Sequence, residues 1–274
     1  MLYKELKEQL SLKPLARFTI IESPSSYANR DIAYFLANED FVYVCGNKVD
    51  DVREIIIKCY EQTSKTIYLF LDADNMTVAA KNALLKVTEE PPQNSYFIMC
   101  IRSKENTLET LLSRADVISL PVLTSKEIGQ YVFEKNVKIS PTDLQLAKSI
   151  CTTVEQANSL LALNSIKEFL DFVEKVVDNI PYVTVTNALK ILEHIKFNDE
   201  HKDKYDLALF LIIYMRCCIN FYMQGKIDMK TLKDISVSTL KVTAKLNVTT
   251  VNKQNAMEIW IMEQWEILGG EKIE

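Results

Sequence analysis

The chain has 274 residues, of which 48% are hydrophobic and 25% are charged, and its formal net charge is −5. This composition excludes a disordered or fibrous protein, and the length favours two or three domains. The negative charge argues against a surface that is basic throughout, so we expect no extensive DNA binding by this chain alone unless a local basic patch exists. Only five residues are glycine, which weighs against an intact glycine-rich loop for binding phosphate.

The cysteines and histidines do not form a metal-binding motif. The sequence has no CxxC pair, and its only histidines are His194 and His201, so we expect no bound metal. The amino-terminal sequence mixes acidic and basic residues and lacks the apolar stretch of a secretory signal. The most apolar stretch, Leu207–Met215, is about half the length that a bilayer span requires. We therefore expect a cytoplasmic protein with reduced thiols and no membrane contact.

The first part of the chain alternates short apolar runs with helical patterns. Five runs rich in β-branched and aromatic residues are predicted to be buried strands: Arg17–Ile21, Phe41–Cys45, Thr66–Leu71, Tyr96–Ile101 and Val117–Leu120. The stretches between them predict helices: Tyr27–Ala37, Val49–Thr63 and Val78–Glu90, the last ended by Pro91 and Pro92. This alternation predicts an α/β domain over residues 1–122, with a parallel five-stranded sheet covered by helices on both faces.

The remaining sequence reads as helical throughout. Residues 123–165 predict a small helical domain, with helices at Ser125–Lys135, Pro141–Cys151 and Val154–Leu163. Residues 166–274 predict an all-α domain with amphipathic helices at Ile166–Asp178, Val185–Lys196, Tyr205–Met223, Met229–Lys245 and Lys253–Leu268. One face of the last helix carries Trp260, Ile261, Trp265 and Leu268. These side chains belong either to an oligomerising surface or to an intramolecular core.

Two stretches carry a specific resemblance. Phe70–Pro92 reads FLDADNMTVAAKNALLKVTEEPP, and Phe97–Ala115 reads FIMCIRSKENTLETLLSRA. Together they resemble the clamp-loader AAA+ family of bacterial DNA polymerase III, in which a Walker B strand leads into an NALLK helix that ends at EEPP, followed by a sensor 1 strand and an SRC arginine-finger motif. The resemblance implies an AAA+ P-loop-type fold over residues 1–122, a lid domain over residues 123–165 and a collar, or oligomerisation, domain over residues 166–274.

The parts of a nucleotide site can be checked against this resemblance. A P-loop needs G-x-x-x-x-G-K-[ST], because backbone amides hold phosphate, the lysine reaches the β- and γ-phosphates and the hydroxyl binds Mg²⁺. The corresponding segment Glu22–Arg30 has neither a glycine nor a Lys-Ser/Thr pair, and Glu22 adds a negative charge. Arg30 is either a substitute for the lysine or a surface residue. At Walker B the alignment places Leu71 where the metal-binding carboxylate belongs and Asp72 at the acid that polarises water.

The other elements of the site also depart from the family. The sensor 1 position falls at Cys100 or Ile101, and no arginine stands between Arg114 and Arg216 to act as sensor 2 of the lid. The four-cysteine zinc module that many relatives carry after the second strand is missing, since Cys45 leads directly to Val49. We therefore expect no nucleotide cofactor and no ATP hydrolysis by this chain.

Ser113 and Arg114 nevertheless match the arginine-finger motif, although Ala115 replaces its usual cysteine. Such a finger acts in trans, because its guanidinium stabilises the transition state at the ATP site of a neighbouring subunit. The alternative is that Arg114 pairs with Glu109 or Asp116 on the surface.

The resemblance implies an ATPase-inactive subunit of a hetero-oligomer with gamma/tau and delta subunits, which helps to place the sliding clamp on primed DNA. Direct contact with the clamp or with primer–template DNA is a further implication that the sequence leaves open. Two alternatives remain: a weakly active clamp-loader ATPase with a divergent loop, and an AAA+-derived adaptor in a phage or recombination assembly.

Overall fold

The computed structural model describes residues 3–38, 41–135, 138–197, 205–246 and 251–270. By packing, the chain falls into two units. The first is Met1–Tyr131 with Cys151–Glu155, and the second is Val132–Ile150 with Gln156–Glu274. The division into three domains, with boundaries at 122/123 and 165/166, stays a prediction.

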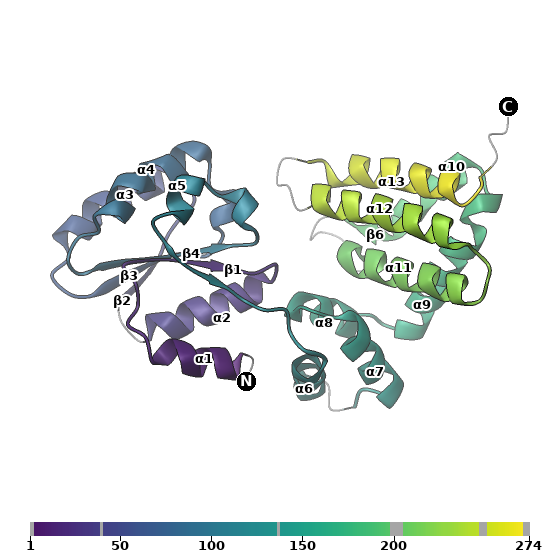
Figure 1. Ribbon diagram of the computed structural model, residues 1–274, viewed down its shortest axis with the longest axis horizontal. Coiled ribbons are helices and arrows are strands. Elements are labelled where there is room, and N and C mark those ends of the chain that lie inside the picture. Colours follow the sequence, from purple (N-terminus) through teal and green to yellow (C-terminus); the bar gives the residue numbers. More distant parts are fainter. Residues whose placement is uncertain (1–2, 39–40, 136–137, 198–204, 247–250, 271–274) are drawn as a thin grey trace. The chain divides into compact units, whose positions relative to one another are not determined.

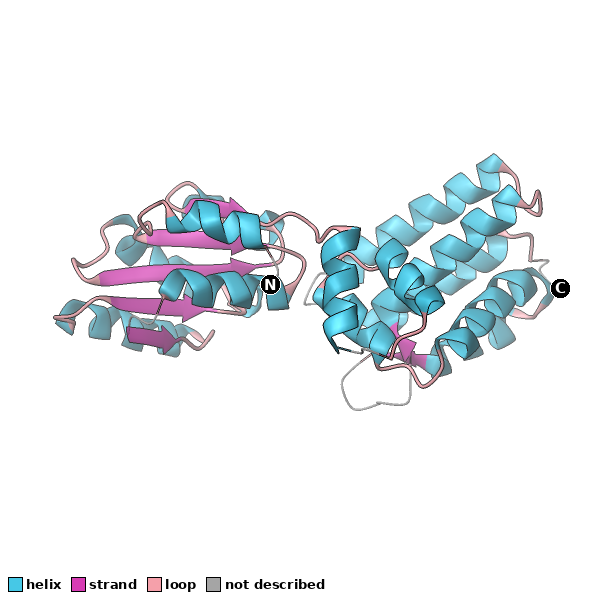
Figure 2. Cartoon of the chain, turned by 90° about the horizontal axis from the view of Figure 1, so that it is seen from below, coloured by secondary structure: helices cyan, strands magenta, loops and turns pink. Residues whose placement is uncertain are grey.

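The first unit contains the expected parallel sheet of five strands, in the order β2-β3-β4-β1-β5. Figure 2 shows its strands as arrows that run in the same direction. Each strand lies within one residue of its predicted bounds: β1 is Phe18–Glu22, β2 is Phe41–Val44, β3 is Thr66–Phe70, β4 is Ser95–Ile101 and β5 is Asp116–Ser119. Because all five are parallel, their carboxyl ends meet at one edge of the sheet.

Helices cover both faces of this sheet, as the alternating sequence predicts (Figure 1). One face is covered by α2 (Ser26–Ala37), against which α1 (Lys4–Ser11) packs. The other face is covered by α3 (Val49–Glu61), α4 (Val78–Glu89) and the short α5 (Glu109–Leu112). The sequence analysis did not predict α1 and α5. Two single turns of 3₁₀-helix, η1 (Ala73–Asn75) and η2 (Lys104–Asn106), follow β3 and β4.

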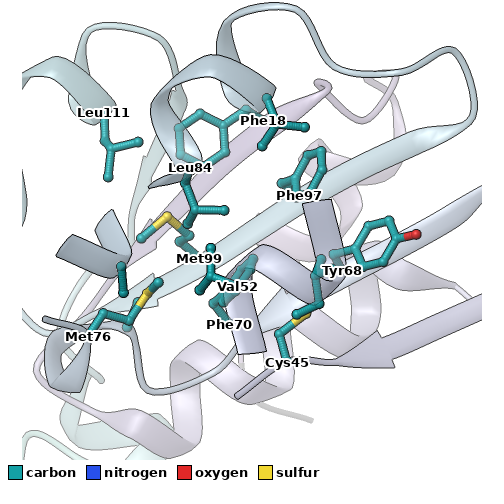
Figure 3. Close-up of a cluster of buried hydrophobic side chains, with 14 of the residues drawn as sticks. Phe18, Cys45, Val52, Tyr68, Phe70, Met76, Leu84, Phe97, Met99 and Leu111 are labelled. Atoms are coloured by element: carbon teal, nitrogen blue, oxygen red, sulfur yellow. The ribbon is translucent and has the colours of Figure 1, made fainter. Parts of the chain in front are cut away.

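Side chains point alternately to the two faces of the sheet along each strand, and those on each face form the core with the helices that cover it. Alternate strand side chains such as Phe18, Tyr68 and Phe97 face α3 and α4 in one buried cluster, together with Val52 and Leu84 (Figure 3). Strand residues between them point to the opposite face, where α2 covers them. Burying a large apolar side chain contributes roughly 1.5–3 kcal/mol. The core therefore fixes the central strands and, with them, the loops at the edge where they end.

The second unit is mainly helical. The helices from Ser125 onward are α6 (Ser125–Lys135) and α8 (Val154–Leu161), which both begin in the first unit, and α7 (Pro141–Ile150), α9 (Ile166–Asn179), α10 (Val185–Leu189), α11 (Leu207–Met223), α12 (Met229–Leu246) and α13 (Lys253–Ile267), with a 3₁₀ turn η3 at Ile180–Tyr182. No helix among the described residues combines the length and the apolar character that crossing a bilayer requires.

One predicted helix is wrong. The segment Val185–Lys196 does not form a single helix: α10 ends at Leu189, a 3₁₀-helix η4 (Lys190–His194) follows, and β6 (Ile195–Lys196) pairs in parallel with β7 (Tyr205–Asp206). The reason lies in the start of α11. Asp206 is the N-cap of α11 and accepts a hydrogen bond from Leu209 N at 2.9 Å. An N-cap residue has extended backbone, so the chain before α11 is available to pair with β6.

The apolar face of α13 is intramolecular core. Trp260, Ile261 and Trp265 are only 2%, 1% and 4% exposed. The indole of Trp260 donates to Thr239 Oγ1 at 3.2 Å, and that of Trp265 donates to Val183 O at 2.8 Å. Of the two readings of this face, the oligomerising surface is therefore wrong for these three residues.

Candidate functional site

The carboxyl-terminal edge of the sheet is where a P-loop protein binds nucleotide. In this chain the edge is formed by Glu22–Arg30 and Leu71–Asp74, which we call the nucleotide-site region. β1 ends at Glu22 and α2 begins at Ser26, so a turn of only three residues, Ser23–Ser25, stands in place of a phosphate-binding loop. Ser25 is the N-cap of α2, and its Oγ accepts from Ala28 N at 3.1 Å.

A carboxylate from a distant part of the chain caps the same helix end. Glu155 lies in the first turn of α8. Its Oε2 accepts from Ser25 Oγ at 2.7 Å, and its Oε1 accepts from Tyr27 N at 2.8 Å. The amino end of a helix carries a partial positive charge and free N–H groups, and it therefore favours an anion. Glu155 supplies that anion from within the chain.

Asn29 ties the turn to the neighbouring strand. It is 2% exposed, and its Nδ2 donates to Ser23 O at 3.1 Å and to Ile101 O at 2.9 Å. These bonds hold the turn against the end of β4. The turn is thus fixed by the side chains of Asn29, Ser25 and Glu155 and not by glycine.

Glu22 has its charge compensated within the chain. Its carboxylate accepts from Ser119 Oγ at 2.7 Å and from Lys104 N at 3.0 Å, and it lies 3.2 Å from Lys104 Nζ. Burial alone would raise the pKa of Glu22, but the hydrogen bonds from Ser119 and Lys104 and the ammonium charge of Lys104 together lower it below its ordinary value of 4.5. Glu22 therefore stays ionised, in a network that is already complete.

At the Walker B position, too, the carboxylates have partners within the chain. Leu71, half-buried after β3, offers no carboxylate where the family binds metal. Asp72 Oδ2 lies 2.9 Å from Arg30 NH2. Asp74 Oδ2 accepts from Arg102 N at 2.9 Å. Arg30 thus neutralises the acid that would have polarised water. Its side chain is 49% exposed, so of the two roles expected for Arg30 the structure shows the surface residue.

The sensor 1 position is apolar. Cys100 is 1% exposed, and burial raises the pKa of its thiol to about 12.

Lys81 on α4 is a buried cation. It donates through Nζ to Asn106 O, which ties α4 to the loop after β4. Burial lowers the pKa of Lys81, although the carboxylate of Asp74 raises it.

Arg114 lies at the other end of the sheet. It follows α5 and precedes β5, so it is placed at the amino end of β5. Its NH1 donates to Thr110 O at 2.6 Å, and its NH2 lies 3.4 Å from Glu89 Oε2, at the end of α4. Arg114 does form a surface ion pair, as the alternative to the arginine finger proposed, but its partner is Glu89 and not Glu109 or Asp116.

Ser113 is exposed beside Arg114. It is the C-cap of α5, and its hydroxyl donates to Thr110 O at 3.1 Å. Thr110 O thus accepts from both residues of the motif, which fixes the turn from which Arg114 projects.

The structure therefore brings the residues of the nucleotide-site region together and keeps Ser113 and Arg114 apart from them. β5 separates Arg114 from the carboxyl edge by roughly 13 Å, at about 3.3 Å for each of its four residues. Sequence reasoning missed Glu155 and Lys104, because neither is close in sequence to its partner: Glu155 and Ser25 are 130 positions apart.

No group of three or more His, Cys, Asp and Glu side chains in the described part of the chain is placed to hold a metal ion. His194 lies at the end of η4, and His201 lies outside the described residues.

Comparison with known proteins gives consistent matches. Residues 24–124 match the family described as DNA polymerase III, delta subunit. The chain is 26% identical over 142 residues to DNA polymerase III subunit delta′ of Bacillus subtilis, which covers 52% of this chain and 42% of that protein. It is 43% identical over 85 residues to subunit delta′ of Escherichia coli, which covers 30% of this chain and 25% of that protein. The matched part is thus less than half the length of either relative.

Among solved structures, the RuvB Holliday junction branch migration motor of Thermotoga maritima has a similar fold, with a TM-score of 0.51 at 13% identity over 96% of this chain and 87% of that chain. This likeness concerns the fold alone. With the five-stranded parallel sheet and the helical region after it, the AAA+ fold expected from the sequence is confirmed.

Proposed function

We propose that the chain belongs to the delta-prime-like branch of the clamp-loader family, which it resembles over residues 24–124, and that it is a non-catalytic clamp-loader subunit of DNA polymerase III that donates Arg114 to the ATP site of a neighbouring subunit. In this role it helps to load the sliding clamp onto primed DNA, while other subunits bind and hydrolyse ATP.

The position of Arg114 carries this proposal. A residue at the amino end of β5 is at the opposite edge of the sheet from the nucleotide-site region of its own chain, so its guanidinium has no route to a phosphate bound there. It is exposed, and its ion pair with Glu89 lies on the surface, where such pairs contribute about 0–1 kcal/mol. Arg114 is therefore available to a phosphate held by another subunit, where a planar, permanently charged donor stabilises the transition state.

The state of the nucleotide-site region supports the absence of catalysis. Hydrolysis of ATP needs a carboxylate for Mg²⁺ and an acid that positions water. Leu71 stands at the first position, and Arg30 holds Asp72 at the second. The turn Ser23–Ser25 is too short to surround phosphate with backbone amides.

The proposed partners are the gamma/tau and delta subunits of the same organism, in a hetero-oligomer. The net charge of −5 favours contact with DNA through the assembled complex and not through this chain alone. Contact with the sliding clamp is part of the same proposal.

Two measurements test the proposal. The purified chain should form a stable complex with gamma/tau and delta subunits of the same organism in size-exclusion chromatography, and it should show no saturable ATP or ADP binding in calorimetry. Tight, Mg²⁺-dependent ATP binding would favour the divergent ATPase instead. Failure to join the complex would favour the adaptor of another assembly.

A further inference from the structure

We propose that Glu155 is an intramolecular ligand of the helix end at which a P-loop protein binds phosphate, so that the chain fills this anion position with its own carboxylate. The two oxygens of its carboxylate hold different partners, Ser25 Oγ and Tyr27 N, at 2.7 and 2.8 Å. Both distances are typical of charge-assisted hydrogen bonds.

The contact uses the donors that a phosphate would use. The first N–H groups of an α-helix have no partner within the helix. At the start of α2, Glu155 takes the N–H of Tyr27, and Ser25 takes that of Ala28. Ser25 links the two, because its hydroxyl accepts from Ala28 N and donates to Glu155. One carboxylate thus organises the first turn of α2 as a bound anion would.

The neighbouring cations are already paired. Arg30, on the same helix, lies 2.9 Å from Asp72, and Lys104 lies 3.2 Å from Glu22. An incoming phosphate would have to displace Glu155, and it would find Arg30 and Lys104 already held by Asp72 and Glu22. Occupation by Glu155 is therefore favoured by hydrogen bonding as well as by charge.

Glu155 is held at this position by its own segment. Thr152 O accepts from Leu123 N at 3.1 Å, and Cys151–Glu155 packs with the first unit. A carboxylate tethered in this way acts at a high effective concentration, with which a free anion has to compete.

A simpler role for Glu155 is a favourable interaction with its own helix, since it lies in the first turn of α8. Glu168 provides a matched control. It occupies the first turn of α9, it is exposed, and it therefore has the same relationship to its own helix. Loss of Glu168 removes a helix-end charge without touching α2.

This inference rests on the proposed function only in treating the region as a former ATP site, and its test uses the isolated chain. Amide hydrogen exchange at Tyr27 and Ala28 is measured in the wild type, Glu155→Ala, Glu155→Gln and Glu168→Ala, each with and without inorganic pyrophosphate. In Glu155→Ala, exchange at Tyr27 should be faster on the order of tenfold or more, and pyrophosphate should slow it again. Glu168→Ala and the wild type should not respond to pyrophosphate.

Glu155→Gln keeps the fold if the alanine variant does not, because an amide oxygen can still accept one of the two bonds. It should fall between the wild type and Glu155→Ala and should also respond to pyrophosphate. Unchanged exchange at Tyr27 in both variants, or faster exchange that pyrophosphate leaves unaltered, would overturn the contact as an anion substitute while leaving the clamp-loader role intact. Tight ATP binding by the wild type would instead contradict the non-catalytic role itself.

Discussion

The guanidinium of Arg114 lies 3.4 Å from the carboxylate of Glu89, and the two residues come from the two sequence stretches that carry the family resemblance. Glu89 closes α4 just before Pro91, and Arg114 follows α5. Their side chains are 60% and 30% exposed, respectively. This exposed ion pair leaves the guanidinium of Arg114 accessible to a partner.

Arg114→Ala and Glu89→Gln should each lower the free energy of unfolding by less than about 1 kcal/mol, because an exposed ion pair contributes little. Urea denaturation of the isolated chain measures this. Arg53→Ala is the matched control, since Arg53 forms an exposed ion pair with Asp50 at 3.2 Å on α3. A loss of several kcal/mol in Arg114→Ala alone would mean that Arg114 has a structural role.

Substituting Arg114 and Glu89 one at a time distinguishes an arginine finger from a simple surface ion pair. If Arg114 acts only through Glu89, both variants should behave alike in every assay. The finger predicts an asymmetry: Arg114→Ala should impair an assembled clamp loader, whereas Glu89→Gln should leave its ATP turnover close to the unmutated rate. Equal effects of the two substitutions on the complex would remove the case for a finger.

Glu22 should make the stability of the chain sensitive to acid. The pKa of Glu22 is lowered in the folded chain, so its contribution is fully present above the ordinary value of 4.5 and is lost as the pH falls through the lowered pKa. The difference in unfolding free energy between the wild type and Glu22→Gln should therefore be largest above pH 4.5 and shrink below it. Urea denaturation over a pH series measures that difference, in which the other carboxyl groups cancel. A difference that does not change with pH would mean that the network of Ser119 and Lys104 does not stabilise the charge.

The buried aromatic side chains of α13 should contribute to the free energy of unfolding. Trp260 is 2% exposed, and its ring lies 4.9 Å from that of Tyr214 on α11. Trp260→Ala should therefore cost about 3–5 kcal/mol, as truncation of a buried aromatic side chain does. Met262 on the same helix is 44% exposed, and Met262→Ala should cost less than about 1 kcal/mol. Similar losses in both variants, measured by thermal or urea denaturation, would contradict the assignment of Trp260 to the core.

The sequence predicted the sheet well because buried parallel strands leave a local signal. Runs such as Thr66–Phe70 are continuous stretches rich in β-branched and aromatic residues, and their bounds can be predicted without the structure. The prediction of one helix after Val185 was wrong because the last residues of this segment pair with Tyr205–Asp206. Pairing between distant segments leaves no local pattern in the sequence.

The same distinction holds for the site. Leu71 and the missing glycines could be recognised by aligning the sequence with the motifs of the family that it resembles. The partners of Glu22, Asp72 and Tyr27 could not, because each comes from another element: Lys104, Arg30 and Glu155 reach their positions only when the strands and helices pack. The absence of motif residues can thus be recognised in the sequence, whereas the side chains that take their place have to be found in the fold.

The most direct test of the central claim uses the complex assembled from this chain and the gamma/tau and delta subunits of its organism. Loading of clamps onto primed DNA and release of phosphate are measured for four forms of the chain: the wild type, Arg114→Ala, Arg114→Lys and Arg53→Ala. Arginine fingers contribute roughly 10³ to 10⁵ in rate, but only one of several ATP sites would lose its donor. We expect clamp loading to fall in Arg114→Ala, total turnover to fall less, and Arg114→Lys to restore little, because an ammonium cannot reproduce the planar fork of a guanidinium. Arg53→Ala should match the wild type. If the Arg114→Ala complex loads clamps and hydrolyses ATP at the unmutated rate, Arg114 is a surface ion-pair residue and the proposed trans contribution is wrong.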